Sequence, residues 1–461
     1  MNTKKNYEVK SIMYNYESYY EKSVHGRYVN HDQVKKFLKK FENNSLFNIR
    51  KAGTSFEGRQ IDLIKIGHGK TKVFFWSQMH GDESTSTRAI LDLLNFLAAN
   101  DENQNKRDKI FENITLYVIP MLNPDGAERF ARRNVQQMDI NRDAVAQQTP
   151  EGKLLYDLKN EIKPDWGFNL HDQSSGYSAG LNYKSSTISL LAPPFNNSAE
   201  INEVRKKAMK LIVSLYEELS DEIPGHIARY DDEFEPRAFG DNFTKDGVST
   251  ILIEAGGWGL DSDREYVRKL FFSALVKSLL LILDNSFTEQ NENEYFNIPE
   301  NKERLYDLVL RNISFSMNDQ NYKMDIAIKR EPYFDAKSKR IYYKGVISDV
   351  GDLSTFFGYD EHDMKGLTFQ PAKIAEQNDS EISQLLENGY QFVKSKSSQK
   401  LWTEKPINYF TASEPKTKFG IDCPANFSLT SENKIRYTVV NGYLIDPLKL
   451  KTFSGNGIVL P

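Results

Sequence analysis

The chain has 461 residues, which is more than one hydrophobic core usually contains, so two domains are expected. Its 60 basic and 64 acidic residues give a net charge of -4. A nucleic-acid-binding protein usually carries a basic excess, so no nucleic-acid partner is expected. Cys423 is the single cysteine, which excludes an intrachain disulfide and a cysteine-rich zinc site. Any bound metal must therefore be held by histidine and carboxylate side chains.

No segment of the sequence has the features of a membrane or secretory element. The first 20 residues have no apolar core after their lysines, unlike a secretory signal. The most apolar stretch, Leu270 to Leu283, is interrupted by Lys277 and is too short to cross a bilayer. We therefore expect a cytoplasmic protein without a membrane partner, and the sequence predicts no particular oligomeric state.

Strand and helix patterns alternate over the first 285 residues. Helical spacing occurs at 31–45, and a turn-rich link follows at 53–59. Strands are expected at 61–66, 73–76, 113–120, 166–170 and 249–253, and helices at 84–99, from Thr149, at 198–219 and at 263–284. This alternation predicts an α/β fold, with a mostly parallel mixed sheet and helices on both faces.

The pattern changes after residue 285. Residues 285–303 are polar and are interpreted as a linker. Beyond them, helical signals are few, and strands are expected at 311–315, 324–328, 340–347, 390–394 and 434–445. The predicted organisation is a catalytic α/β domain at 1–290 and a smaller, β-rich C-terminal domain at 305–461.

Histidine and carboxylate side chains follow three of the expected strands. His80 and Glu83 lie in the loop after the strand at 73–76, His171 follows the strand at 166–170, and Glu254 follows Thr-Ile-Leu-Ile. Open α/β sheets place ligands beyond the carboxyl ends of their strands, and zinc accepts both imidazole nitrogen and carboxylate oxygen. Taken singly, each has an ordinary alternative: a loop polar residue, a core histidine or a salt-bridged strand end. Together they indicate a metal site.

Two further motifs lie between these strands. Leu122-Asn-Pro-Asp-Gly126 has the composition of a turn. It is followed by an arginine-rich segment, 129–143, which would usually be a solvated basic face. Beside a metal, its arginines would instead suit a substrate carboxylate, which an arginine can bind through two parallel hydrogen bonds.

The ordered set His-x-x-Glu, Asn-Pro-Asp-Gly, Arg, Asn-Arg, His, Glu resembles the zinc metallocarboxypeptidases typified by carboxypeptidase A. Gly53-x-Ser-x-Glu-Gly-Arg59 is similar to the family's usual lead-in, and the resemblance covers about residues 30–285. It implies one Zn²⁺ per chain, with His80, Glu83 and His171 as the metal ligands. It also implies a peptide or peptide-like substrate with a free carboxylate.

The same resemblance implies roles for the remaining site residues. Glu254 matches the general base, and Arg132 matches the arginine that polarises the scissile carbonyl, with Arg133 as the fallback. Asn141 and Arg142 match the pair that binds the terminal carboxylate.

Three positions match the family's pattern less closely. Tyr230 is the candidate for the substrate-facing tyrosine, and a surface-loop tyrosine is its alternative. Asp172 is either a partner of a metal ligand or a loop acid. The specificity pocket is expected near Phe239-Gly-Asp241, without an identifiable floor.

The function expected from this set is the release of a C-terminal residue from a peptide, with a cell-wall peptide as one candidate. A zinc deacylase of a small N-acyl amino acid and a non-catalytic peptide-binding relative are the alternatives. In the C-terminal part, segments such as 425–445 resemble the β segments of amidohydrolases, but the His-x-His metal motif is absent from the sequence, where Ala372-Lys-Ile-Ala stands in its place.

Overall fold

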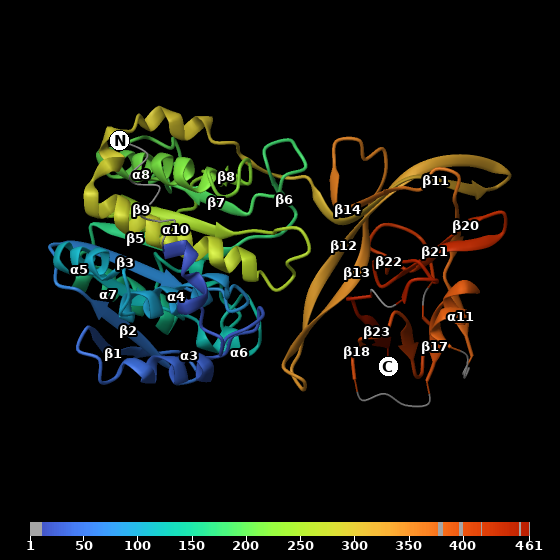
Figure 1. The fold of residues 1–461 in the computed structure, drawn as a ribbon, viewed down its shortest axis with the longest axis horizontal. Helices are drawn as coiled ribbons and strands as arrows, with labels where there is room; N and C mark the ends of the chain where they lie inside the picture. The colour runs from blue at the N-terminus through green and yellow to red at the C-terminus, as the bar shows by residue number, and fades with distance from the viewer. Residues whose placement is uncertain (1–11, 377–380, 396–399, 416, 451–452, 461) are drawn as a thin grey trace. The chain divides into compact units, whose positions relative to one another are not determined.

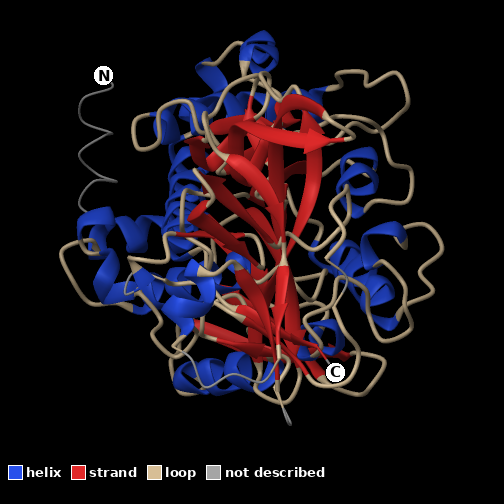
Figure 2. Cartoon of the chain, turned by 90° about the vertical axis from the view of Figure 1, so that its right-hand side faces the viewer, coloured by secondary structure: helices blue, strands red, loops and turns tan. Residues whose placement is uncertain are grey.

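The computed structural model describes residues 12–376, 381–395, 400–415, 417–450 and 453–460. The chain divides into two compact units, Met1–Glu303 and Arg304–Pro461. The first unit extends to Glu303, beyond the limit of 290 expected from the sequence. Figure 1 shows the elements of both units along the chain, and Figure 2 distinguishes their helices from their strands.

A mixed eight-stranded sheet forms the centre of the first unit. Its order is β1-β2-β4-β3-β5-β9-β7-β8, and β4, β3, β5 and β9 run parallel to one another. On one side, β2 pairs antiparallel with β4 and β1 pairs antiparallel with β2. On the other side, β7 pairs antiparallel with β9 and β8 pairs parallel with β7. The strands are β1 (Phe47–Thr54), β2 (Gln60–Ile66), β3 (Thr71–Ser77), β4 (Ile114–Ile119), β5 (Trp166–Asp172), β7 (Ile188–Leu191), β8 (Ile227–Arg229) and β9 (Ser249–Ala255).

Helices cover both faces of this sheet, which confirms the predicted α/β fold class. Val73 and Phe75 of β3 belong to one hydrophobic cluster, whereas Phe74 and Trp76 belong to another, because successive side chains of a strand point to opposite faces. The first cluster includes residues of α4 (Thr85–Ala98), α8 (Glu203–Ser220) and α10 (Glu265–Asp284). The second includes residues of α7 (Pro150–Ile162) and α9 (Phe239–Lys245). Shorter helices are α2 (Tyr16–Tyr19), α3 (His31–Leu38), η1 (Lys39–Phe41), α5 (Gln104–Asn113), α6 (Pro124–Glu128) and η2 (Ile140–Arg142).

The polar stretch at 285–303 is not a linker, and this part of the sequence interpretation is wrong. It forms η3 (Ser286–Glu289), η4 (Glu292–Asn297) and β10 (Asn301–Glu303), which pairs with β6 (Tyr177–Ala179). Phe287 packs edge-on against Trp166 with 5.2 Å between ring centroids, and Tyr295 is fully buried. A few large apolar side chains thus hold a polar segment to the first unit.

Two other expected elements have different limits in the structure. The helix expected from residue 198 begins at Glu203, because the Asn202 side chain accepts a hydrogen bond from the Arg205 N–H and caps the helix there. Part of the link expected at 53–59 belongs to β1, which continues to Thr54.

The second unit is rich in strands, as the sequence predicts. One sheet has the order β13-β12-β11-β15-β20-β21-β22, with β14 also paired to β11, and a second has the order β16-β17-β19-β23-β18. The strands are β11 (Leu305–Met317), β12 (Gln320–Asp335), β13 (Arg340–Gly351), β14 (Phe357–Asp363), β15 (Thr368–Pro371), β16 (Lys373–Ala375), β17 (Tyr390–Lys394), β18 (Trp402–Thr403), β19 (Asn408–Phe410), β20 (Phe427–Ser431), β21 (Lys434–Val440), β22 (Tyr443–Ile445) and β23 (Gly457–Leu460). Among the described residues of this unit, one short helix, α11 (Ile382–Glu387), accompanies the strands.

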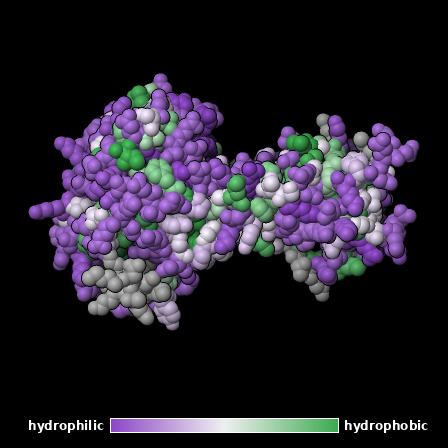
Figure 3. All heavy atoms as spheres, turned by 90° about the horizontal axis from the view of Figure 1, so that it is seen from above, coloured by the Kyte–Doolittle hydropathy of each residue, from purple (hydrophilic) through white to green (hydrophobic). Residues whose placement is uncertain are grey.

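The described helices include none with the length and apolar character that a membrane span requires. On the face drawn in Figure 3, hydrophilic side chains predominate over both units.

Candidate metal centre and active-site cavity

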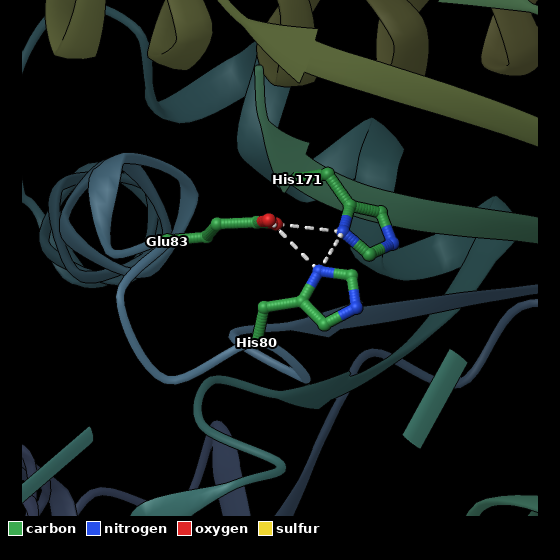
Figure 4. Close-up of side chains that lie close together, drawn as sticks. All are labelled: His80, Glu83 and His171. Atoms are coloured by element: carbon green, nitrogen blue, oxygen red, sulfur yellow. Dashed lines mark hydrogen bonds and ion pairs between the residues drawn. The ribbon is translucent and has the colours of Figure 1, made fainter. Parts of the chain in front are cut away.

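His80, Glu83 and His171 converge at the carboxyl end of the parallel strands. His80 and Glu83 lie in the turn between β3 and α4, and His171 is the last residue but one of β5. Figure 4 shows the three side chains pointing at one another. All three are at least nine-tenths buried. In the described part of the chain, this is the single group of three such side chains close enough to share a metal ion.

The geometry of the triad fits a tetrahedral zinc ion. The Nδ1 atoms of His80 and His171 each lie 2.8 Å from a Glu83 carboxylate oxygen and 3.2 Å from each other. Zinc bonds of about 2.0–2.1 Å in a tetrahedron place neighbouring ligand atoms about 3.3 Å apart. Electron-pair donors brought this close together suit a shared cation.

Asp139 orients the first of these ligands. Its Oδ1 lies 3.0 Å from Nε2 of His80, the ring nitrogen opposite Nδ1. A carboxylate in this position selects the tautomer and the ring orientation of a ligating histidine. The sequence indicated no role for Asp139 at the metal, because its contact with His80 joins two loops that are distant in the sequence.

The Asn-Pro-Asp-Gly turn supports the loop that carries His80. The Asn123 amide donates to the carbonyl of Met79, and a Cβ added at Gly81 would lie only 2.1 Å from the carbonyl carbon of Gly126. Gly81 is therefore required by a close approach of two backbones. The Asn-Pro-Asp-Gly turn also contacts the Gly53–Arg59 motif, because Asp125 accepts hydrogen bonds from the Ser55 hydroxyl and the Arg59 guanidinium.

Glu254 lies beside the triad on the neighbouring strand. It is paired in register with His171 across β5 and β9, and the residue is 6 % exposed. Its Oε2 has no hydrogen-bond partner among the described residues. Burial, together with the charges of Glu83 and Asp172, raises its pKa well above the usual value for a glutamate. This environment favours acceptance of a proton.

The predicted arginine and asparagine residues also reach this site. Arg132 donates from Nη1 to Glu83 at 3.1 Å, and its Nε and Nη2 donate to Asp139. Arg133, the fallback, donates to the Gln137 carbonyl and does not line the cavity.

Asn141 and Arg142 form the short helix η2 beside them. The Asn141 Oδ1 accepts a hydrogen bond from the Phe239 N–H at 3.0 Å. Arg142 donates from Nη1 to the Asn141 carbonyl, and its Nε lies 3.0 Å from Glu235. Nη2 is the remaining donor group of this guanidinium.

Tyr230 lines the same cavity, although its distance from Glu254 in the sequence departs from the family's pattern. The nearby charge of Glu254, together with burial, raises the pKa of its hydroxyl far above the usual value. Tyr230 therefore stays protonated and can donate a hydrogen bond.

Asp172 corresponds fully to neither expectation. Its backbone N–H donates to Oε2 of Glu83 at 3.2 Å, whereas its carboxylate accepts from the Thr85 hydroxyl and lies 3.3 Å from Arg264. Arg264, which the sequence did not indicate, donates to the carbonyls of Ala255 and Gln173. These two hydrogen bonds connect the carboxyl ends of β9 and β5.

All eight predicted site residues border one cavity of about 520 Å³. The metal cluster is buried, consists of two histidines and one glutamate, and opens to this cavity at the carboxyl ends of the parallel strands. This is the arrangement of a mononuclear zinc site with room for a substrate.

Comparisons with known proteins agree with this class. Residues 34–148, which carry two of the three ligands, match the family model described as "Zinc carboxypeptidase". Carboxypeptidase SOL1 of Arabidopsis thaliana is 28% identical over 124 residues, or 25% of each chain. A probable carboxypeptidase 2 of Arthroderma benhamiae is 30% identical over 111 residues, or 24% of this chain and 20% of its own. The matched stretch thus spans about a quarter of these relatives' length or less.

The structure also resembles solved metallo-carboxypeptidases. One from Burkholderia cenocepacia has a TM-score of 0.44 and 17% identity, over 56% of this chain and 69% of its own. The sequence matches confirm the predicted resemblance to the zinc carboxypeptidase family. Since the matched family is one of zinc enzymes and the triad offers zinc's ligands, they also confirm the predicted cofactor.

Proposed function

We propose that this protein is a zinc-dependent carboxypeptidase that removes one residue from the free C-terminus of a peptide. One observation supports it above the others: the triad, Glu254 and Arg142 border a single cavity. A metal, a proton acceptor and a cation for a terminal carboxylate are the three groups that such a reaction needs.

Each group has a defined task in the proposed reaction. Zinc, when bound, supplies Lewis-acid activation of the attacking water and of the scissile carbonyl. Glu254 takes the proton from the water and later passes it to the leaving amine. Arg132 stabilises the negative charge that develops on the carbonyl oxygen.

The C-terminal carboxylate is held at the opposite side of the reacting bond. Asn141 and Arg142 bind it, and Tyr230 donates a hydrogen bond to the bound peptide. Fixing the end of the chain selects the last peptide bond for cleavage, because only that bond then lies beside Glu254 and the triad.

Cleavage of matched peptides with free and amidated C-termini tests the proposal. The free acid should be cut, and the amide should be cut at least about tenfold more slowly, since a charge-assisted bond to Arg142 is lost. Arg142→Ala should reduce kcat/KM about ten- to several-hundredfold on the free acid and hardly change it on the amide.

Arg133→Ala is the matched control, because Arg133 is a neighbouring arginine outside the cavity. Equal cleavage of the free and amidated peptides would refute the carboxypeptidase assignment. Cleavage of N-acyl amino acids but not of peptides would favour the deacylase alternative, and zinc-dependent peptide binding without turnover would favour the binding protein.

A further inference from the structure

Residues 230–235, here called the Tyr230 segment, leave the sheet at the end of β8. The backbone N–H of Tyr230 donates to the Leu190 carbonyl at 2.9 Å, and beyond it the segment belongs to no helix or strand. Of the residues in this segment, Asp232 is the one that does not border the active-site cavity. Its side chain therefore has a different environment from those of its neighbours.

Two buried arginines bind the Asp232 carboxylate. Nη2 of Arg205 donates to Oδ2 at 3.2 Å, and Nη1 of Arg229 lies 3.3 Å from Oδ1. The Arg205 side chain is fully buried, and that of Arg229 is 8 % exposed. Cations this buried need a paired anion, because an unpaired buried charge is costly. The two arginines together therefore determine where Asp232 lies.

Other parts of the first unit hold both arginines in place. Arg205, on α8, donates from Nε to the Ala192 carbonyl at 3.0 Å. Arg229, the last residue of β8, lies 2.6 Å from Glu300 and 5.6 Å from the ring centroid of Tyr295. Tyr295 is fully buried, and its hydroxyl accepts a hydrogen bond from the Ala192 N–H. The helices α8 and η4 and the end of β7 thus form one packed support for the Tyr230 segment.

The position of the Tyr230 phenol matters for the proposed reaction. Tyr230 lines the same cavity as Glu254, whose charge is the main cause of the raised pKa of its hydroxyl, so the two groups are close. Ordering an irregular segment at the moment of binding would cost conformational entropy. A phenol that is held in place before the peptide arrives avoids this cost.

We infer that Asp232 is a positioning residue, which anchors the Tyr230 segment to Arg205 and Arg229 and so holds the phenol in place for the substrate. The inference rests on the proposed function, in which Tyr230 donates a hydrogen bond to the bound peptide. Because the Asp232 side chain lies outside the cavity, its effect on cleavage passes through Tyr230.

A double-mutant cycle on a free-acid peptide tests the inference. Tyr230→Phe should lower kcat/KM about three- to tenfold, the effect of losing one hydrogen bond. Asp232→Asn should lower kcat/KM by a similar factor in protein that has Tyr230 and cause no further loss in Tyr230→Phe protein. A merely structural effect would lower kcat/KM by the same factor in both backgrounds.

Glu300→Gln is the matched control, because Glu300 is the other carboxylate bound to Arg229 and lies outside the Tyr230 segment. It should change kcat/KM in neither background. Asp232→Glu covers the case in which Asp232→Asn does not fold, because it keeps the negative charge between the arginines. Its side chain is longer by one methylene, so it should shift the segment and cause a smaller loss, again only in protein that has Tyr230.

Hydrogen exchange supplies a second readout without turnover. Asp232→Asn should speed the exchange of the amides in the Tyr230 segment, and Glu300→Gln should not. Equal losses of kcat/KM in both backgrounds, or unchanged exchange in the segment, would overturn the inference and leave the carboxypeptidase proposal standing. Wild-type activity in Tyr230→Phe protein would have the same meaning. Absence of cleavage of every free-acid peptide would remove both the inference and the proposed function.

Discussion

The carboxylate of Asp139 and the ring of His80 face each other across 3.0 Å, on the side of the imidazole away from the metal position. Asp139 also receives two hydrogen bonds from Arg132. Asp139 thereby links His80, a metal ligand, to Arg132, the arginine proposed to act on the scissile carbonyl.

Asp139→Asn should weaken zinc binding without unfolding the protein. An amide does not hold the imidazole as a carboxylate does, so an affinity loss of about 10–100-fold is expected. Competition with a chelator, followed by elemental analysis, measures it. His171→Ala, which removes a ligand, should lose the metal altogether, and His362→Ala, in the second unit, serves as the control. Wild-type zinc affinity in Asp139→Asn would show that the contact has no influence on the metal.

Glu254→Gln should keep the zinc and the fold but lose activity. The substitution is nearly isosteric and removes the proton acceptor, which typically costs about 10²–10⁴ in rate. Single-turnover cleavage measures the loss, and zinc content measured on the same sample excludes metal loss as the cause. Near wild-type turnover would mean that Glu254 is only a structural residue of β9.

Phe287→Ala should destabilise the first unit substantially. Phe287 is 2% exposed and packs on Trp166, so its truncation removes buried contacts worth about 3–5 kcal/mol. Chemical denaturation followed by tryptophan fluorescence measures the change. Phe296→Ala is the matched control, since Phe296 lies in the same segment and is 45% exposed. A similar, small loss of stability in both variants would show that residues 285–303 are a loosely attached linker.

The sequence predicts the residues that follow strands better than those in long loops. His171 and Glu254 could be placed together because each ends a short apolar run, and parallel strands bring such ends to one edge. The contact of Asp139 with His80 could not be predicted, because it is made by loops whose path depends on the whole fold. The segment at 285–303 was misread because Phe287 and Tyr295 show no regular spacing, so its polar composition concealed its packing.

The register between His171 and Glu254 has a consequence for local opening of the site. These two residues are adjacent in a backbone hydrogen-bond ladder, whereas His80 and Glu83 depend on a turn held by side chains and close packing. Local fluctuations open loops more readily than central strands, so amide exchange around His80 should be faster than around His171. Metal release would then need only the loop of His80 and Glu83 to open, while β5 and β9 stay paired. Glu254 would still lie beside His171 when a metal ion binds again.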